Sequence, residues 1–151
     1  MKIDLVVGAY IVDKSKILLI HHKKLKLWLP VGGHIEKDEI PDDALHREIK
    51  EEVNLKVQIL STDDIQQEGN TKRICATPFH VSVHSVGDHD HCCFFYVCKA
   101  LNPESLKIND EVTHAQWFSR EQLSQVQVPL DVRNIGLKAL EIANSFPEEE
   151  E

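Results

Sequence analysis

The start of the chain consists of apolar runs separated by a short polar turn. Ile3 to Val12 is apolar and rich in β-branched residues, and Lys16 to His22 repeats that character after the polar residues Asp13 to Ser15. Two such runs around a short polar turn predict a β-hairpin. Residues 27–30 then lead into a short predicted strand, Val31 to Ile35, that ends in a glycine-rich loop. The first 35 residues therefore predict strands.

A helical period replaces the strand pattern after the glycines. From Asp42 to Val53, apolar residues recur at spacings of one, four and four, which is the period of one helical face. Pro41 can begin this helix, because the first helical position does not need the N–H that proline lacks. A second apolar period, between Leu130 and Ala143, predicts a closing amphipathic helix.

Strand patterns fill the region between the two helices. Pro78 to Val86 alternates apolar with polar residues, and His91 to Leu101 resumes the pattern after a turn, so the two segments predict a second hairpin. Lys56 to Leu60 and Val112 to Phe118 predict further short strands. We therefore expect one α+β domain over residues 1–147, with a mixed sheet and at least two helices. The acidic residues 148–151 are expected to form a solvated, disordered tail.

The composition fits a globular domain and argues against several other classes. Of the 151 residues, 42% are hydrophobic, which is enough for a sizeable core. No run approaches the roughly 18 apolar residues that cross a bilayer, and Asp4 falls where a signal peptide has its apolar stretch. The four cysteines lack paired spacing, so we expect reduced thiols rather than a disulfide framework. These features predict a cytoplasmic protein with no membrane contact.

The net charge of −8 is concentrated in two places. Residues 33–55 hold eight acidic and three basic residues, and residues 148–151 add four more acids. The rest of the chain is nearly neutral, with 13 acidic against 14 basic residues. Without a broad basic face, the chain is not expected to bind duplex nucleic acid. The acids on one short segment instead favour bound divalent cations.

Three glutamates share one face of the first predicted helix. Glu48, Glu51 and Glu52 stand at positions i, i+3 and i+4, so at about 100° per residue their carboxylates lie within about one turn. Like charges at this spacing weaken a helix, which suggests a cation between them. Mg²⁺ prefers oxygen ligands and binds through a few carboxylates together with substrate phosphates. An ordinary solvated helix face is the alternative interpretation.

The residues around these glutamates resemble the Nudix box, G-x5-E-x7-R-E-U-x-E-E-x-G-U, in which U is aliphatic. Gly33, Glu39 and Arg47 stand at the spacing of the box, and residues 48–55 continue it. Every specified position matches except one, because Asn54 stands where the box has its last glycine. Asn is the usual second choice where a helix ends in left-handed backbone.

This resemblance implies a Nudix-type α/β/α sandwich around a mixed β-sheet. It also implies hydrolysis of the diphosphate linkage in a small nucleoside diphosphate derivative, with Mg²⁺ or Mn²⁺ as cofactor. Glu48, Glu51 and Glu52 would be metal ligands and catalytic residues, and the carbonyl of Gly32 would be a backbone ligand. Glu51 is also a candidate for the base that activates water.

Further charged residues are given supporting roles by the resemblance. Arg47, counted among the catalytic residues, would orient a glutamate. Glu39 would stabilise the junction between loop and helix, or join an outer metal shell. Some members of the family use an additional acid outside the box, for which Glu111, Asp110 and Asp90 are candidates and Glu111 is preferred.

The sequence indicates much less about the substrate than about the reaction. Weak candidates for substrate binding are Lys24, Trp28, His80 and His91. Aromatic side chains that could stack on a base, or belong to the core, are Trp28, Phe79, Tyr96 and Trp117. The histidine-rich second hairpin allows three interpretations: polar side chains on an outer face, the lining of a substrate pocket, or a structural zinc site within residues 89–93.

Two other classes of function remain open. The chain could be a non-catalytic nucleotide-binding module of the Nudix fold, although the three box glutamates are present. It could also be an RNA 5′-end pyrophosphohydrolase, although its charge balance does not predict a basic path for RNA. A homodimer is expected by family analogy alone.

Overall fold

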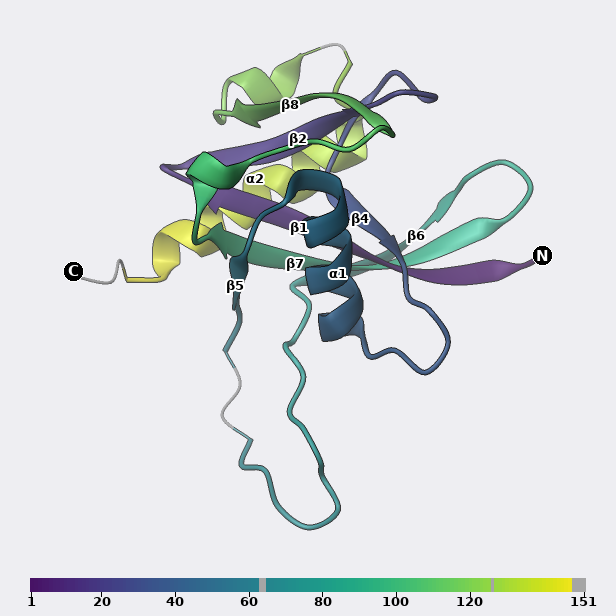
Figure 1. Cartoon of the computed structure of the whole chain (residues 1–151), viewed down its shortest axis with the longest axis vertical. Helices are drawn as coiled ribbons and strands as arrows, with labels where there is room; N and C mark the ends of the chain where they lie inside the picture. Colours follow the sequence, from purple (N-terminus) through teal and green to yellow (C-terminus); the bar gives the residue numbers. More distant parts are fainter. Residues whose placement is uncertain (63–64, 126, 148–151) are drawn as a thin grey trace.

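The long first strand, β1 (Ile3–Asp13), lies in the middle of an eight-stranded sheet (Figure 1). This computed structural model describes residues 1–62, 65–125 and 127–147, so the predicted acidic tail lies outside the described residues. β1 pairs antiparallel with β2 (Lys16–His22) and β4 (Val31–His34), and parallel with β7 (Asp90–Ala100). The sheet is therefore mixed, as the sequence predicts.

The remaining strands extend the sheet from β2 and from β7. Both β3 (Trp28–Leu29) and β8 (Val112–Phe118) pair with β2, while β5 (Val57–Leu60) and β6 (His80–Ser85) pair with β7. The β1–β2 and β6–β7 pairs confirm the two predicted hairpins. Two short 3-10 helices, η1 (Pro103–Ser105) and η2 (Gln122–Ser124), follow β7 and β8.

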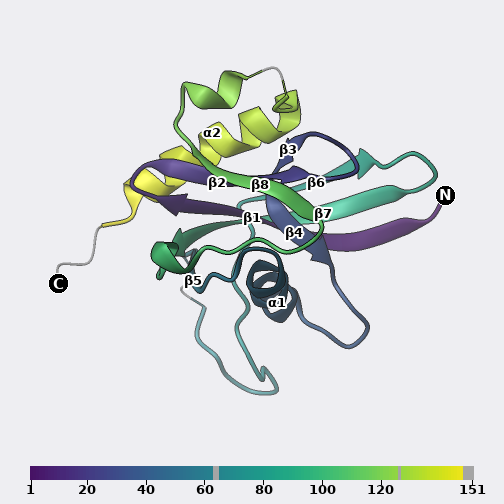
Figure 2. The same ribbon diagram turned by 45° about the horizontal axis from the view of Figure 1, so that its top comes forward.

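The two predicted helices lie on opposite faces of this sheet (Figure 2). α1 (Pro41–Val53) packs on one face, and α2 (Leu130–Ser145) packs on the other, which gives an α/β/α sandwich. Alternate residues of β1 enter the two cores: Val7 joins the α1 side, and Val6 joins the α2 side. This burial on both faces explains why residues 6–12 of β1 are apolar without alternation. Within the described residues, no helix combines the length and apolarity needed to cross a membrane.

One end of the sheet projects past α1. The beginning of β1 and the β6–β7 hairpin extend together beyond the helix, toward the N-terminus (Figure 1). β6 alternates as predicted, but Val81 and Val83 on its apolar side are 47% and 59% exposed. α1 does not cover this side of β6, because the helix packs against β1 and β4 further along the sheet. This projecting end therefore presents both of its faces to solvent.

Candidate active site

The carboxylates of α1 face the glycines of β4. Glu52 extends from the last turn of α1, and its Oε1 accepts a hydrogen bond from the N–H of Gly32 at 3.0 Å. The residue is only 8% exposed. In a strand, the N–H and C=O of one residue point to the same side. The carbonyl of Gly32 therefore points to the same side of β4 as the Glu52 carboxylate.

Both glycines of β4 are required by close contacts. A side chain at Gly32 would collide with the carbonyl oxygen of Val7 in β1, and a side chain at Gly33 would occupy the position of the Glu48 carboxylate. Gly33 thus forms a cradle for Glu48, whose side chain is 15% exposed. Strand and helix meet here with carboxylate packed against backbone.

Arg47 holds several of the surrounding oxygens in place. Its Nε and Nη2 donate to the two carboxylate oxygens of Glu39, each at 2.9 Å. Its Nη1 donates to Glu48, and its Nη2 also donates to the carbonyl of His34, both at 2.9 Å. The contact with Glu51 is longer, at 3.5 Å. Because a bidentate guanidinium fixes both distance and direction, Arg47 positions Glu39 and Glu48 more firmly than Glu51.

The electrostatics separate these carboxylates into two kinds. The hydrogen bonds from Arg47 lower the pKa of Glu39 to about 2. Burial, together with the charges of Glu48, Glu111 and Glu51, raises the pKa of Glu52 to about 8, although the hydrogen bond from Gly32 opposes the shift. Burial likewise raises the pKa of Glu48, although Arg47 opposes that shift. The charge of Glu39 is thus balanced by Arg47. Glu48 and Glu52 are partly buried near other carboxylates, and both have a raised pKa.

One acid from a distant part of the chain joins the box glutamates. Glu111, in the turn before β8, is close enough for its charge to raise the pKa of both Glu48 and Glu52. Its backbone is held there by the N–H of Lys23, which donates to the Glu111 carbonyl at 3.1 Å. Asp90 begins β7 at the projecting end, where it pairs with Ile3. The charge of Glu111 thus acts on Glu48 and Glu52, and its role as the additional acid stays a prediction.

Comparison with known proteins identifies the fold and its family. The family model of the NUDIX domain matches residues 2–138. The chain belongs to the Nudix family. A NUDIX-family hydrolase from Clostridium perfringens is 30% identical, with 95% of this chain and 99% of that one covered at a TM-score of 0.82. Among curated proteins, none matches this chain.

Two more distant solved structures share the Nudix fold. A MutT NUDIX hydrolase from Burkholderia pseudomallei is 22% identical, over 93% of this chain and 98% of that one, with a TM-score of 0.69. An Ap4A hydrolase from C. elegans is 17% identical, over 95% of this chain and 99% of that one, with a TM-score of 0.75. At these identities the likeness concerns the fold.

The end of the Nudix box has left-handed backbone at the position where this chain departs from the box. Asn54 has φ 58° and ψ 32°, and its N–H donates to the carbonyl of Lys50 at 3.1 Å. Its side chain adds two bonds that glycine lacks: Nδ2 donates to the carbonyl of Ser105 at 3.0 Å, and Oδ1 accepts from Lys50 at 2.8 Å. Asparagine therefore closes the helix and also ties it to the segment after β7.

The oxygen donors of the Nudix box fit a hard divalent cation. Glu48, Glu51, Glu52 and the carbonyl of Gly32 offer oxygen atoms only, the ligand type that Mg²⁺ and Mn²⁺ prefer. Burial is the first cause of the raised pKa of Glu52, so a bound cation would favour the charged form of this carboxylate.

The aromatic candidates for base stacking lie on different faces of the Nudix sheet. Trp28 packs on the α2 side, edge-on to Phe118 at 5.0 Å, while Trp117 packs on the α1 side. Tyr96 is a core residue, 2% exposed. Trp28 and Trp117 therefore cannot stack on the same base. Lys24 is exposed in the turn after β2, where its N–H donates to His22 Nδ1.

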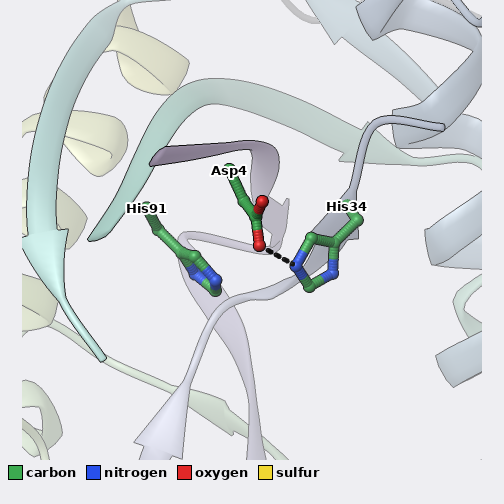
Figure 3. A group of neighbouring side chains, drawn as sticks. All are labelled: Asp4, His34 and His91. Atoms are coloured by element: carbon green, nitrogen blue, oxygen red, sulfur yellow. Dashed lines mark ion pairs between the residues drawn. The ribbon is translucent and has the colours of Figure 1, made fainter. Parts of the chain in front are cut away.

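The histidines that the sequence groups together are only partly together in the structure. His91 lies beside His34 and Asp4, from three different strands (Figure 3). His80 lies four residues before His84 along β6 and stacks on Phe95 instead. His34 and Asp4 carry no signal in the sequence, because the pairing of β1 with β4 and β7 brings them to His91.

Proposed function

We propose that this Nudix protein is a metal-dependent pyrophosphohydrolase that cleaves the diphosphate linkage of a small nucleotide derivative. The observation that carries the proposal is the buried Glu52 carboxylate, which lies against the Gly32 N–H and close enough to Glu48 for each charge to be felt. Among the described residues no basic side chain pairs with Glu52, so folding buries this acid at a cost. A cation that also binds the substrate phosphates would stabilise the charged carboxylates of such a site.

Glu48, Glu52 and the carbonyl of Gly32 would hold the cation, with Glu51 completing the set. Mg²⁺ or Mn²⁺, when bound, supplies charge neutralisation at the phosphate oxygens and a lower pKa for bound water. Arg47 and Glu39 have a positioning role, because their bidentate pair fixes Glu48 through Arg47 Nη1.

The proton of the attacking water needs an acceptor with a free oxygen. Glu51 fits this role, since its side chain is 56% exposed and its contact with Arg47 is 3.5 Å long. Water would form the new P–O bond, its proton would pass to the Glu51 carboxylate, and the bond to the bridging oxygen would break. Glu111 is the second candidate for this acceptor, because its charge reaches Glu48 and Glu52.

A nucleotide panel tests the proposal. The purified chain would be assayed with Mg²⁺ or Mn²⁺ against a nucleoside triphosphate, an ADP-sugar, a dinucleoside polyphosphate and a 5′-triphosphate RNA. We expect one small nucleotide to be cleaved, with turnover reduced about 10²–10⁴-fold in Glu52→Gln. Glu141→Gln, at a side chain on α2 that is 70% exposed, is the matched control and should keep full turnover.

Each outcome of the panel points to one interpretation. Turnover that survives both EDTA and Glu52→Gln contradicts the metal–carboxylate mechanism. A thermal shift with a nucleotide but no cleavage would indicate a non-catalytic binding module. Cleavage of the RNA alone would indicate the 5′-end activity. The homodimer and the cytoplasmic location stay predictions beside this proposal.

A further inference from the structure

The projecting end of the sheet carries a second group of metal-ligating side chains. Asp4 stands near the start of β1, His34 ends β4, and His91 follows the first residue of β7. Their ligand atoms all lie within 4.8 Å of one another. Figure 3 shows the three side chains grouped together. His89, in the β6–β7 turn, reaches the same group. We call these four residues the histidine–aspartate cluster.

Three contacts within the cluster have the spacing of neighbouring ligands in a tetrahedral zinc site. Asp4 Oδ2 lies 3.3 Å from His34 Nε2 and 3.3 Å from His89 Nε2. His89 Nε2 lies 3.3 Å from His91 Nε2. In a tetrahedral zinc site with bonds of about 2.0–2.1 Å, neighbouring ligand atoms are about 3.3–3.4 Å apart. Each of these three contacts therefore has zinc-ligand spacing, and Asp4, His34 and His91 offer ligand atoms that all lie within 4.8 Å of one another.

The hydrogen bonding of His89 directs a lone pair at this group. Its Nδ1 lies 2.7 Å from Asp88 Oδ1, so in the neutral ring the proton belongs on Nδ1 and the lone pair on Nε2. That lone pair points at a carboxylate oxygen of Asp4 and at a nitrogen of His91. Acceptors that converge in this way need a cation between them. A carboxylate that orients a metal-binding histidine through its other nitrogen is also the usual support of a zinc ligand.

The two oxygens of Asp4 are divided between separate partners. Oδ1 lies 3.4 Å from Lys2 Nζ, which leaves Oδ2 for the histidines.

We propose that Asp4, His34, His89 and His91 bind a transition-metal ion of the zinc class, as a second metal site separate from the Nudix carboxylates. Imidazole nitrogen suits Zn²⁺, Ni²⁺ and Co²⁺, whereas Mg²⁺ prefers the oxygen donors of the box. The ion would connect the start of β1, the end of β4 and the β6–β7 turn. The site is structural, and it does not rest on the proposed hydrolase activity.

Titration of the untagged full-length chain with Co²⁺, in excess Mg²⁺, tests this site. Tetrahedral Co²⁺ with nitrogen ligands has intense visible absorption, which hexacoordinate Co²⁺ at carboxylates lacks. We expect one equivalent to bind with that spectrum and to be displaced by Zn²⁺. His91→Ala and Asp4→Asn should each weaken binding about tenfold or more, while His46→Ala, an exposed histidine of α1, should not.

Three results would overturn the site. These are no tetrahedral Co²⁺ spectrum with the folded wild-type chain, equal affinity in His91→Ala and His46→Ala, and loss of the spectrum in Glu52→Gln. Without a tetrahedral Co²⁺ spectrum, the contacts among His89, His91 and Asp4 would be explained by a shared proton instead of a metal ion. If His91→Ala does not fold, Asp4→Asn and the rise in melting temperature with Zn²⁺ decide the question instead.

Discussion

The Nudix carboxylates and the histidine–aspartate cluster lie on opposite faces of the sheet, at neighbouring residues of β4. Gly33 faces α1 and makes room for Glu48, while His34 faces the other side and approaches Asp4. The carboxylates come from one helix, so their spacing is visible in the sequence. The ligands of the cluster come from separate strands and the β6–β7 turn, so only the pairing of the strands unites them. Oxygen donors on one face and nitrogen donors on the other separate hard from softer cations.

Gly33→Ala should have the largest effect on turnover and Mg²⁺ binding on the α1 face, without affecting the other face. The added methyl takes the place of the Glu48 carboxylate, so we expect turnover and the Mg²⁺-induced rise in melting temperature to fall at least about tenfold. Tetrahedral Co²⁺ binding should persist, because His34 faces away. The helical Gly136→Ala is the control: its nearest neighbours are 3.4–3.5 Å from the new methyl, and it should stabilise the chain by up to about 1 kcal/mol. A parallel loss of both metals in Gly33→Ala would contradict the separation of the two faces.

Arg47→Lys examines the contact between the two regions. Arg47 fixes Glu39 and Glu48 on one side and the carbonyl of His34 on the other, and an ammonium cannot make the bidentate pair. We expect kcat to fall about 10–100-fold. Steady-state kinetics would measure this change, with Arg73→Lys, an exposed pair with Asp43, as the control. Unchanged kcat in Arg47→Lys would remove Arg47 from the positioning role.

The pH dependence of stability should distinguish the buried glutamate from its exposed counterparts. The folded pKa of Glu52 is about 8, above its ordinary 4.5, so the folded chain without metal loses stability as the pH rises from about 4.5 to about 8. Gln cannot ionise and can still accept the Gly32 bond. Glu52→Gln should therefore match the wild type near pH 4.5 and exceed it above pH 8, by up to about 5 kcal/mol. Urea unfolding at several pH values measures the difference, and a constant offset at every pH would refute it.

Asn54→Gly should have the smallest effect. Glycine adopts φ 58° without strain, but it loses the side-chain bonds with Ser105 and Lys50. These opposed changes predict a shift in unfolding free energy below about 1 kcal/mol, with little change in turnover. Asn54→Val, whose branched side chain resists left-handed backbone, should destabilise the chain by more. Equal stability of the two variants would mean that the backbone of residue 54 is not held in this conformation.

The sequence alone determined the elements and the Nudix box. Chain geometry sets the spacing of residues within one helix or strand, so the periods of β1, β7, α1 and α2 are readable, and so is the shared face of Glu48, Glu51 and Glu52. The box also identified the family that the comparisons show. The division of residues 28–34 into β3 and β4 was not readable, because β3 pairs with β2 and β4 with β1.

Tertiary structure decided what lies beside these elements. Glu111 approaches the box, Val81 and Val83 stay uncovered, and His91 meets residues 4 and 34 rather than His80. Each of these outcomes depends on strand register and on where a helix stops covering the sheet. Register is set by side-chain packing between segments far apart in the sequence, which no local period records.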